Sequence, residues 1–248
     1  DTIVNLPASH CDEHAIGMLA RFAAYWLENG HLSQKAAALR LFRHLLTILP
    51  ETAPVRQEIQ RSVSAADCED STPLLFLQAQ LERELGGETA QQDAILNDTD
   101  SISNVFLDNL KSATPWVLKA VGVEYLLDQV QRGGHQHVLH IATHFSNLIK
   151  VSENVVVRRM AGTSLLTIAP FLTPDSRNEI AVELSKALET GQSEISKYIP
   201  EYLGQFSLWL TPRELDELTG QMEALLSYTN DNVVAAALGT VGAMLEHY

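Results

Sequence analysis

Cysteine is scarce in this chain: its 248 residues include two, Cys11 and Cys68, which lie far apart in the sequence. Two cysteines are too few for a disulfide framework, and they lack the paired spacing of a zinc ribbon. This usage favours a reducing compartment, so we expect a cytoplasmic protein. The Gly-rich phosphate loops and the G-x-S-x-G pattern around a nucleophilic serine are also missing from the sequence.

Basic residues are in short supply, with 17 Lys and Arg against 31 Asp and Glu and a formal net charge of −14. Both halves are acidic, since residues 1–124 carry 9 basic and 17 acidic groups and residues 125–248 carry 8 and 14. A protein that tracks phosphates needs the opposite balance, so we expect no nucleic-acid partner. A DNA-binding groove would have to be assembled from a minority of cations.

Long apolar runs are missing as well. The nearest is about 14 residues, from 161 to 174, with Pro170 inside it, whereas a membrane span needs roughly 18. The sequence opens without the pattern of a signal peptide, and we expect no membrane association. Because the chain begins at Asp1 rather than Met, we expect a trimmed protein or a piece of a larger chain or complex.

Helical periodicity is the feature that is present almost everywhere. Apolar residues recur at i, i+3, i+4 and i+7, and strict alternation over a strand length is hard to find, so the fold class predicted is all-α. The expected helices cover residues 12–28, 33–49, 53–65, 73–86, 100–112, 115–131, 135–150, 153–171, 174–190, 193–210, 212–228 and 231–247.

Four Thr-Pro pairs predict helix starts, with Thr as the N-cap and Pro at the first helical position. They begin at Thr72, Thr114, Thr173 and Thr211. Glu214 follows Thr211 at the spacing of a capping box, in which each side chain satisfies a backbone N–H of the other residue.

The chain matches itself at a 38-residue offset, which is the separation of Thr173 from Thr211. The run Phe171-Leu172-Thr173-Pro174 falls on Trp209-Leu210-Thr211-Pro212, and the apolar stripes of residues 157–168 fall on those of 195–206 and 233–244. Two helices and two short loops in a unit of this length are typical of a solenoid of helical hairpins, in which each pair covers the apolar side of the one before.

The segments 154–161 and 230–237 resemble the second helix of a HEAT repeat. In that family an Asp or Asn precedes the helix, followed by a Val-Arg pair and small residues. The resemblance implies a right-handed α-solenoid of stacked antiparallel helix pairs, with about six irregular HEAT-like (HEAT/armadillo) repeats. The Arg of the pattern is present as Arg158, but its counterparts are Ser196 and Val234, so the polar ladder of regular arrays is mostly absent.

The pattern is interrupted between residues 67 and 100, where Gly86-Gly87 leads into a polar run. We therefore divide the chain into irregular N-terminal helical pairs at 1–99 and HEAT-like repeats at 100–248. A long loop within one continuous solenoid is favoured, because short arrays need stacked neighbours on both sides. A linker between two domains is the alternative.

The histidines of segment 135–150 are the strongest candidates for chemistry. His137, His140 and His144 lie at i, i+3 and i+7, and neutral imidazoles at i, i+4 can chelate a metal. A helical wheel instead puts them on the flank of a core stripe, and no Glu occupies the H-E-x-x-H position. His10 and His14 have the same spacing, but the favoured interpretation is the first turn of a helix, with Ser9 as its cap and Asp12 and Glu13 near the positive end of the helix dipole. We predict no catalytic residue, no metal and no cofactor, and the case for an enzyme is weak.

The remaining candidates are surface stripes on the second helices of the pairs. Tyr198, Tyr202 and Gln205 run along one edge of segment 193–210, and Arg159 and Lys197 coincide at the 38-residue offset. Tyr and Arg commonly anchor protein interfaces, although these rings can also pack on the neighbouring repeat. The function predicted is a protein-binding scaffold or adaptor segment for a protein or peptide partner, which the acidic balance favours to be basic. A metal-dependent enzyme centred on the helix of His137, His140 and His144 is the alternative.

Overall fold

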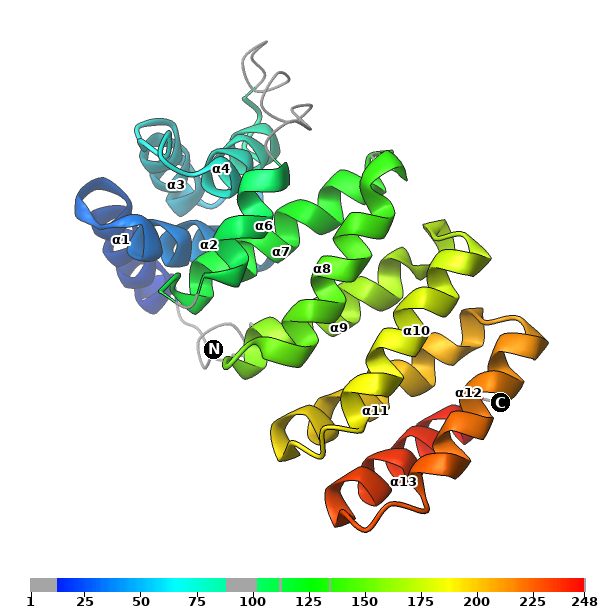
Figure 1. Cartoon of the computed structure of the whole chain (residues 1–248). Helices are drawn as coiled ribbons and strands as arrows, with labels where there is room; N and C mark the ends of the chain where they lie inside the picture. The colour runs from blue at the N-terminus through cyan, green and yellow to red at the C-terminus, as the bar shows by residue number, and fades with distance from the viewer. Residues whose placement is uncertain (1–12, 88–101, 112, 134, 248) are drawn as a thin grey trace. The chain divides into compact units, whose positions relative to one another are not determined.

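The computed structural model of the chain describes residues 13–87, 102–111, 113–133 and 135–247 (Figure 1). Throughout these ranges the secondary structure is helical, with short 3-10 turns and no strand, which confirms the all-α prediction. None of the helices in these ranges has the length and apolar character needed to cross a membrane. The chain divides into two compact units, Asp1–Tyr125 and Leu126–Tyr248.

The first unit is built from helix pairs around a shared apolar core. Helix α1 packs against α2 and α3, while α4 packs against α2 and α3. The core contains the buried sides of all four helices, including Leu27, Phe42, Ile59 and Leu77. Its described helices are α1 (Glu13–Asn29), α2 (Leu32–Ile48), α3 (Pro54–Ser64), α4 (Thr72–Glu84), α6 (Ile102–Leu110) and the first part of α7 (Trp116–Gln131).

The division between the units falls inside α7, between Tyr125 and Leu126. The boundary predicted at residues 99–100 lies outside the described residues and stays a prediction. Glu124 of α7 forms ion pairs with Arg40 at 3.4 Å and Arg43 at 2.6 Å, both on α2. The ring of Tyr125 meets that of Phe76 on α4 edge to face, with centroids 5.0 Å apart. These contacts fasten the first part of α7 to the helices that precede it in sequence.

The second unit contains the end of α7 and then three helix pairs that follow one another (Figure 1). Within the pairs, α8 packs on α9, α10 on α11 and α12 on α13. Between pairs, α8, α10 and α12 pack in that order as one layer, and α9, α11 and α13 form the other. The helices are α8 (Val138–Val151), α9 (Val155–Ile168), α10 (Pro174–Leu188), α11 (Ser193–Phe206), α12 (Pro212–Leu225) and α13 (Asp231–Leu245).

The 38-residue offset recurs in the local structure. Helix α9 ends in the 3-10 turn Ala169–Phe171, and α11 ends in the equivalent turn Ser207–Trp209. The next helices begin at Thr173 and Thr211, whose hydroxyls accept hydrogen bonds from the backbone N–H groups of Ser176 and Glu214. The Glu214 carboxylate accepts from the N–H of Thr211 at 2.7 Å, so the predicted capping box is confirmed.

The other two Thr-Pro pairs were assigned wrongly as N-caps. Helix α4 begins at Thr72 itself, with Ser71 as the N-cap, and α7 begins at Trp116. The carbonyl of Pro115 accepts the first helical hydrogen bonds, from the N–H groups of Leu118 and Lys119. Proline is tolerated at several positions around a helix start, because the first N–H groups have no partner within the helix. A Thr-Pro pair therefore marks the start only to within a residue or two.

Candidate interaction surfaces

The five predicted binding residues do not share one environment. Arg159 on α9 and Lys197 on α11 are exposed, and Gln205 on α11 is half-buried. Tyr198 and Tyr202 are buried, with 6% and 5% of their surfaces exposed. The two tyrosines therefore match the packing alternative, and little of either ring is accessible to a partner.

Tyr202 lies over Gly162 of the preceding helix pair. A Cβ atom added at Gly162 would overlap the ring, with Cε1 only 2.5 Å away, so the absence of a side chain there makes room for the tyrosine. Its hydroxyl donates a hydrogen bond to the carbonyl of Arg159 at 3.4 Å. Burial, with a smaller contribution from the neighbouring Glu201, raises the pKa of this hydroxyl. Tyr202 thus joins α11 to α9.

Tyr198 lies beside two cations. The guanidinium of Arg158 is 5.5 Å from the ring centroid and the ammonium of Lys197 is 5.6 Å from it, distances at which a cation is attracted to an aromatic face. Arg158 is itself buried and donates from Nε to the carbonyl of Ser152, at the end of α8. Arg158 therefore connects α8, α9 and α11, a role that Val234 at the equivalent position of α13 cannot fill.

The exposed sides of α9 and α11 carry matching positions at the 38-residue spacing. Arg159 aligns with Lys197, and Thr163 aligns with Glu201; all four are exposed. Gln205 continues the row on α11. The alignment of Arg159 and Lys197 in the sequence points to this surface, and both side chains are exposed although the tyrosines lie in the interior.

His137, His140 and His144, the histidines of the alternative metal-site prediction, differ in how far they are exposed to solvent. His144 is buried, and burial lowers its pKa to about 4, whereas His140 one turn earlier is exposed. His137 precedes α8 in the 3-10 turn His135–His137. No three His, Cys, Asp or Glu side chains in the described ranges are grouped so that they could hold a metal ion. His14 is exposed, and His10 lies outside the described residues.

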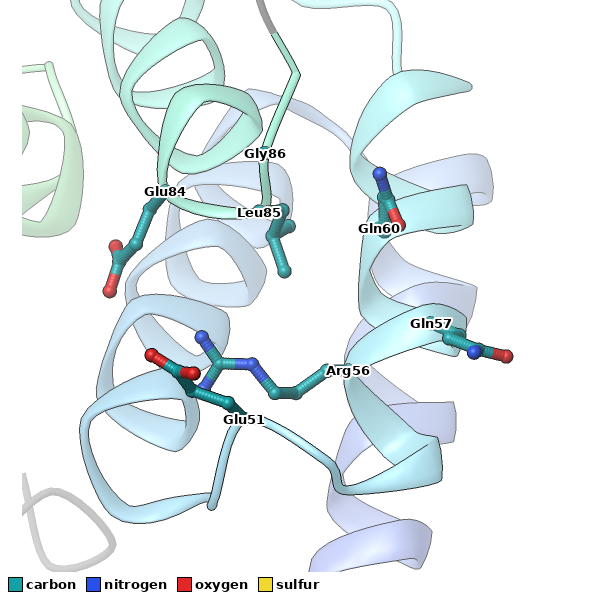
Figure 2. A pocket seen from close by; sticks show the side chains of 7 residues that line it. All are labelled: Glu51, Arg56, Gln57, Gln60, Glu84, Leu85 and Gly86. Atoms are coloured by element: carbon teal, nitrogen blue, oxygen red, sulfur yellow. The ribbon is translucent and has the colours of Figure 1, made fainter.

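A polar hollow of about 310 Å³ lies in the first unit, between the start of α3 and the end of α4 (Figure 2). Figure 2 shows Arg56 extended from α3 toward Glu51, with Glu84 on the same side. The guanidinium donates to the carbonyls of Leu46 and Leu49 at 3.1 and 3.0 Å, so it caps the C-terminal end of α2. The lining residues comprise carboxylates, amides, Arg56, Leu85 and Gly86, without a nucleophile and base pair.

Two exposed apolar surfaces were missed by the sequence reasoning. Met18, Phe22 and Tyr25 form a stripe on α1 and are 53–62% exposed. On α13, Leu238 and Leu245 are 56% and 72% exposed. Both stripes have helical spacing and could have been found on a helical wheel, as the side opposite the more regular core stripe. A wheel alone does not show which of two apolar sides is covered.

Comparison with known proteins does not assign a role to any of these surfaces. The chain matches no family model, no curated protein and no solved structure. Function is therefore inferred from the arrangement of the residues themselves.

Proposed function

We propose that the chain is a protein-binding scaffold, built as an irregular right-handed solenoid of about six HEAT-like helix pairs and acting in the cytoplasm. Support comes from the succession of three pairs in the second unit and from the local features that recur at the 38-residue spacing. In such arrays each pair has its apolar sides covered by its neighbours, which leaves the outer side of each layer free for recognition.

The observation that carries this proposal is the row of exposed, aligned positions on α9 and α11. Arg159 and Lys197 project from successive pairs, while the opposite sides of both helices are buried in the core. A row that repeats from pair to pair suits an extended polypeptide or a protein surface better than a compact small molecule, which needs a concave pocket.

The partner is proposed to be a protein or peptide of mixed charge with a basic excess. The net charge of −14 favours encounter with a basic molecule through long-range steering. Arg159 and Lys197 would then contact acidic side chains of that partner, and Glu201 a basic one. Since exposed pairs contribute little affinity individually, they would act mainly by orienting the bound chain.

A photo-cross-linking amino acid at Gln205 provides the first test, with a matched probe at Lys186 on α10, in the other layer. A partner captured from Gln205 and not from Lys186 supports the proposal. Binding of that partner is then compared for Lys197→Glu and Lys186→Glu, two exposed lysines with opposite expectations. We expect the first change to weaken binding about tenfold and the second to leave it unchanged. Equal losses, or equal capture in both layers, would contradict the proposal.

The metal-dependent enzyme gains no support from the positions of His137, His140 and His144, since His144 is buried and His140 faces solvent. A second function is therefore not proposed.

A further inference from the structure

Several positions that are buried in or directly after α9 and α11, the earlier helices of the same layer, are exposed in α13. Pro200 and Gly204 of α11 and Ser207 directly after it are buried in the second unit, where α13 packs on α11. Their counterparts at the 38-residue offset are Leu238, Gly242 and Leu245, which are all exposed. Gly162 of α9 and Ala169 directly after it, the counterparts of Pro200 and Ser207, are likewise buried, and Leu166, the counterpart of Gly204, is half-buried.

Gly204 on α11 and Gly242 on α13 are aligned at the 38-residue offset, and they differ in the space around them. A Cβ atom added at Gly204 would lie 2.9 Å from the backbone carbon of Ala243 and 3.0 Å from the nitrogen of Met244, so Gly204 allows the α13 backbone to approach closely. Gly242 is the same residue at the equivalent place, and nothing lies within 4 Å of its added Cβ. A notch like the one that receives α13 is therefore present on α13 itself, and none of the described residues fills it.

The surroundings of this notch define the outer face of α13. It consists of the exposed Leu238, Gly242 and Leu245 with the half-buried Val234 and Val241. Asp231 lies two helical turns before Leu238 on the same side, and Glu246 directly follows Leu245. The face is therefore an apolar stripe with an acidic residue at each end, about 22 Å apart for 15 residues of α-helix.

The charge of the second unit is concentrated on its last helix pair. Residues 126–213 carry 8 basic and 8 acidic groups, whereas residues 214–248 carry 6 acidic groups and neither Lys nor Arg. The acidic residues are Glu214, Asp216, Glu217, Glu223, Asp231 and Glu246. Such a pair attracts a basic partner and repels a second copy of itself.

We infer that the outer face of α13 is a docking surface for an amphipathic α-helix of a partner protein, with an apolar stripe flanked by Lys or Arg at both ends. The α11–α13 packing supplies the geometry, because the partner helix would sit on Gly242 as α13 sits on Gly204. Pairing of α13 with α13 of a second copy in antiparallel fashion would bring Asp231 against Glu246, two like charges. The inference concerns a different surface from that of Arg159 and Lys197 and stands independently of the proposed function.

A fluorescent helical peptide tests this directly. The probe is a designed amphipathic helix of about five turns, long enough to cover the face, with a Leu and Ala stripe and Lys at both ends. The matched peptide has Glu in place of each Lys. With the full chain, we expect saturable binding of the Lys peptide, measured by fluorescence anisotropy, and at least tenfold weaker binding of the Glu peptide.

Two glycine variants locate the site. Gly242→Leu fills the notch and is expected to weaken binding of the Lys peptide at least tenfold, whereas Gly220→Leu on α12 leaves it unchanged. Nothing lies within 4 Å of a Cβ atom at either glycine, so we expect both variants to keep the fold, which circular dichroism checks. A second variant, Leu238→Asp with Leu245→Asp, is expected to abolish binding, while Arg159→Glu with Lys197→Glu leaves it intact.

Three outcomes would overturn the inference. Failure of the Lys peptide to bind at millimolar concentration would refute the proposed partner chemistry. Equal binding to the Gly242→Leu and Gly220→Leu variants would place the peptide elsewhere. A dimer of the free chain that Gly242→Leu dissociates, seen by light scattering, would assign the face to a second copy.

Discussion

Helices α11 and α13 have equivalent positions in successive pairs, but among the described residues only α11 has a later helix of the same layer packed on it. Both carry a glycine at the same place of the 38-residue offset, and α11 uses its glycine to admit the backbone of the next helix. On α13 the equivalent Gly242 is open, and the flanking leucines face solvent. Whether a helix face belongs to the core thus depends on the presence of the next pair. Equivalent substitutions on the two helices should therefore have different effects on stability.

The largest effect is expected where a ring fills the space between pairs. Tyr202→Ala should lower the free energy of unfolding by about 3 kcal/mol or more, since it empties a buried aromatic site against Gly162. Gln205→Ala, on the open side of the same helix, should change it by less than about 0.5 kcal/mol. Urea denaturation measures both. A small loss for Tyr202→Ala would return this residue to the partner-binding surface.

The glycine pair gives a sharper contrast. Gly204→Ala should cost about 2 kcal/mol, because the new Cβ atom meets the α13 backbone and forces the helices apart. Gly242→Ala should stabilise the chain by up to about 1 kcal/mol, since alanine favours an exposed helix interior and meets nothing there.

Thermal melting of the two variants beside the wild type decides between them. Similar shifts for both would mean that α13 does not approach α11 as closely as the structure shows.

Helix α8 also has a covered side, with the buried His144, and an open side, with the exposed His140. We expect the two sides to contribute differently to the pH dependence of the stability. The pKa of His144 is lowered to about 4 by burial, so the folded chain holds this imidazole neutral while the unfolded chain protonates it below about pH 6.5. Stability is therefore lost as the pH falls from about 6.5 toward 4, by about 2 kcal/mol between pH 6.5 and 5.

Replacing His144 by Gln should reduce this pH dependence, while replacing the exposed His140 by Gln should not. Unfolding by urea at several pH values measures the slopes. A wild-type slope that survives His144→Gln unchanged would assign the acid sensitivity to other groups.

The smallest effect compares the helix starts of two successive pairs. Thr173→Ala and Thr211→Ala should each cost about 1 kcal/mol, because both hydroxyls accept a backbone N–H. Thr72→Ala should cost less, since Thr72 lies inside α4 and Ser71 is the N-cap. Thermal melting measures the stability of the three variants. Equal losses of stability at Thr72, Thr173 and Thr211 would contradict a capping contribution of the Thr173 and Thr211 hydroxyls.

The helices and their offset were predictable because they depend on local spacing. Apolar stripes such as Ile199, Leu203 and Phe206 have the period of a helix, and Thr173 and Thr211 cap their own first turns. The ion pairs of Glu124 on α7 with α2 were not predictable, since α2 lies far earlier in the sequence.

The candidate site was only partly predictable for the same physical reason. Tyr198 and Tyr202 lie beside a core stripe, and a helical wheel places them at its edge, where exposure depends on the adjacent pair. Gly162 decides the matter by making room for a ring, and a glycine in another helix pair carries no local signal of that contact. Arg159 and Lys197 were identifiable because the repeat itself aligns them.

Hydrogen exchange by mass spectrometry, with the Lys-ended helical peptide added to the full chain, most directly tests whether α13 repeats the helix-receiving face of α11. We expect slower exchange of the backbone amides of residues 234–245, and no change in α1, whose Met18, Phe22 and Tyr25 stripe is also apolar and exposed. Slower exchange in α1 with none in α13 would contradict the equivalence of the two helices as receiving faces.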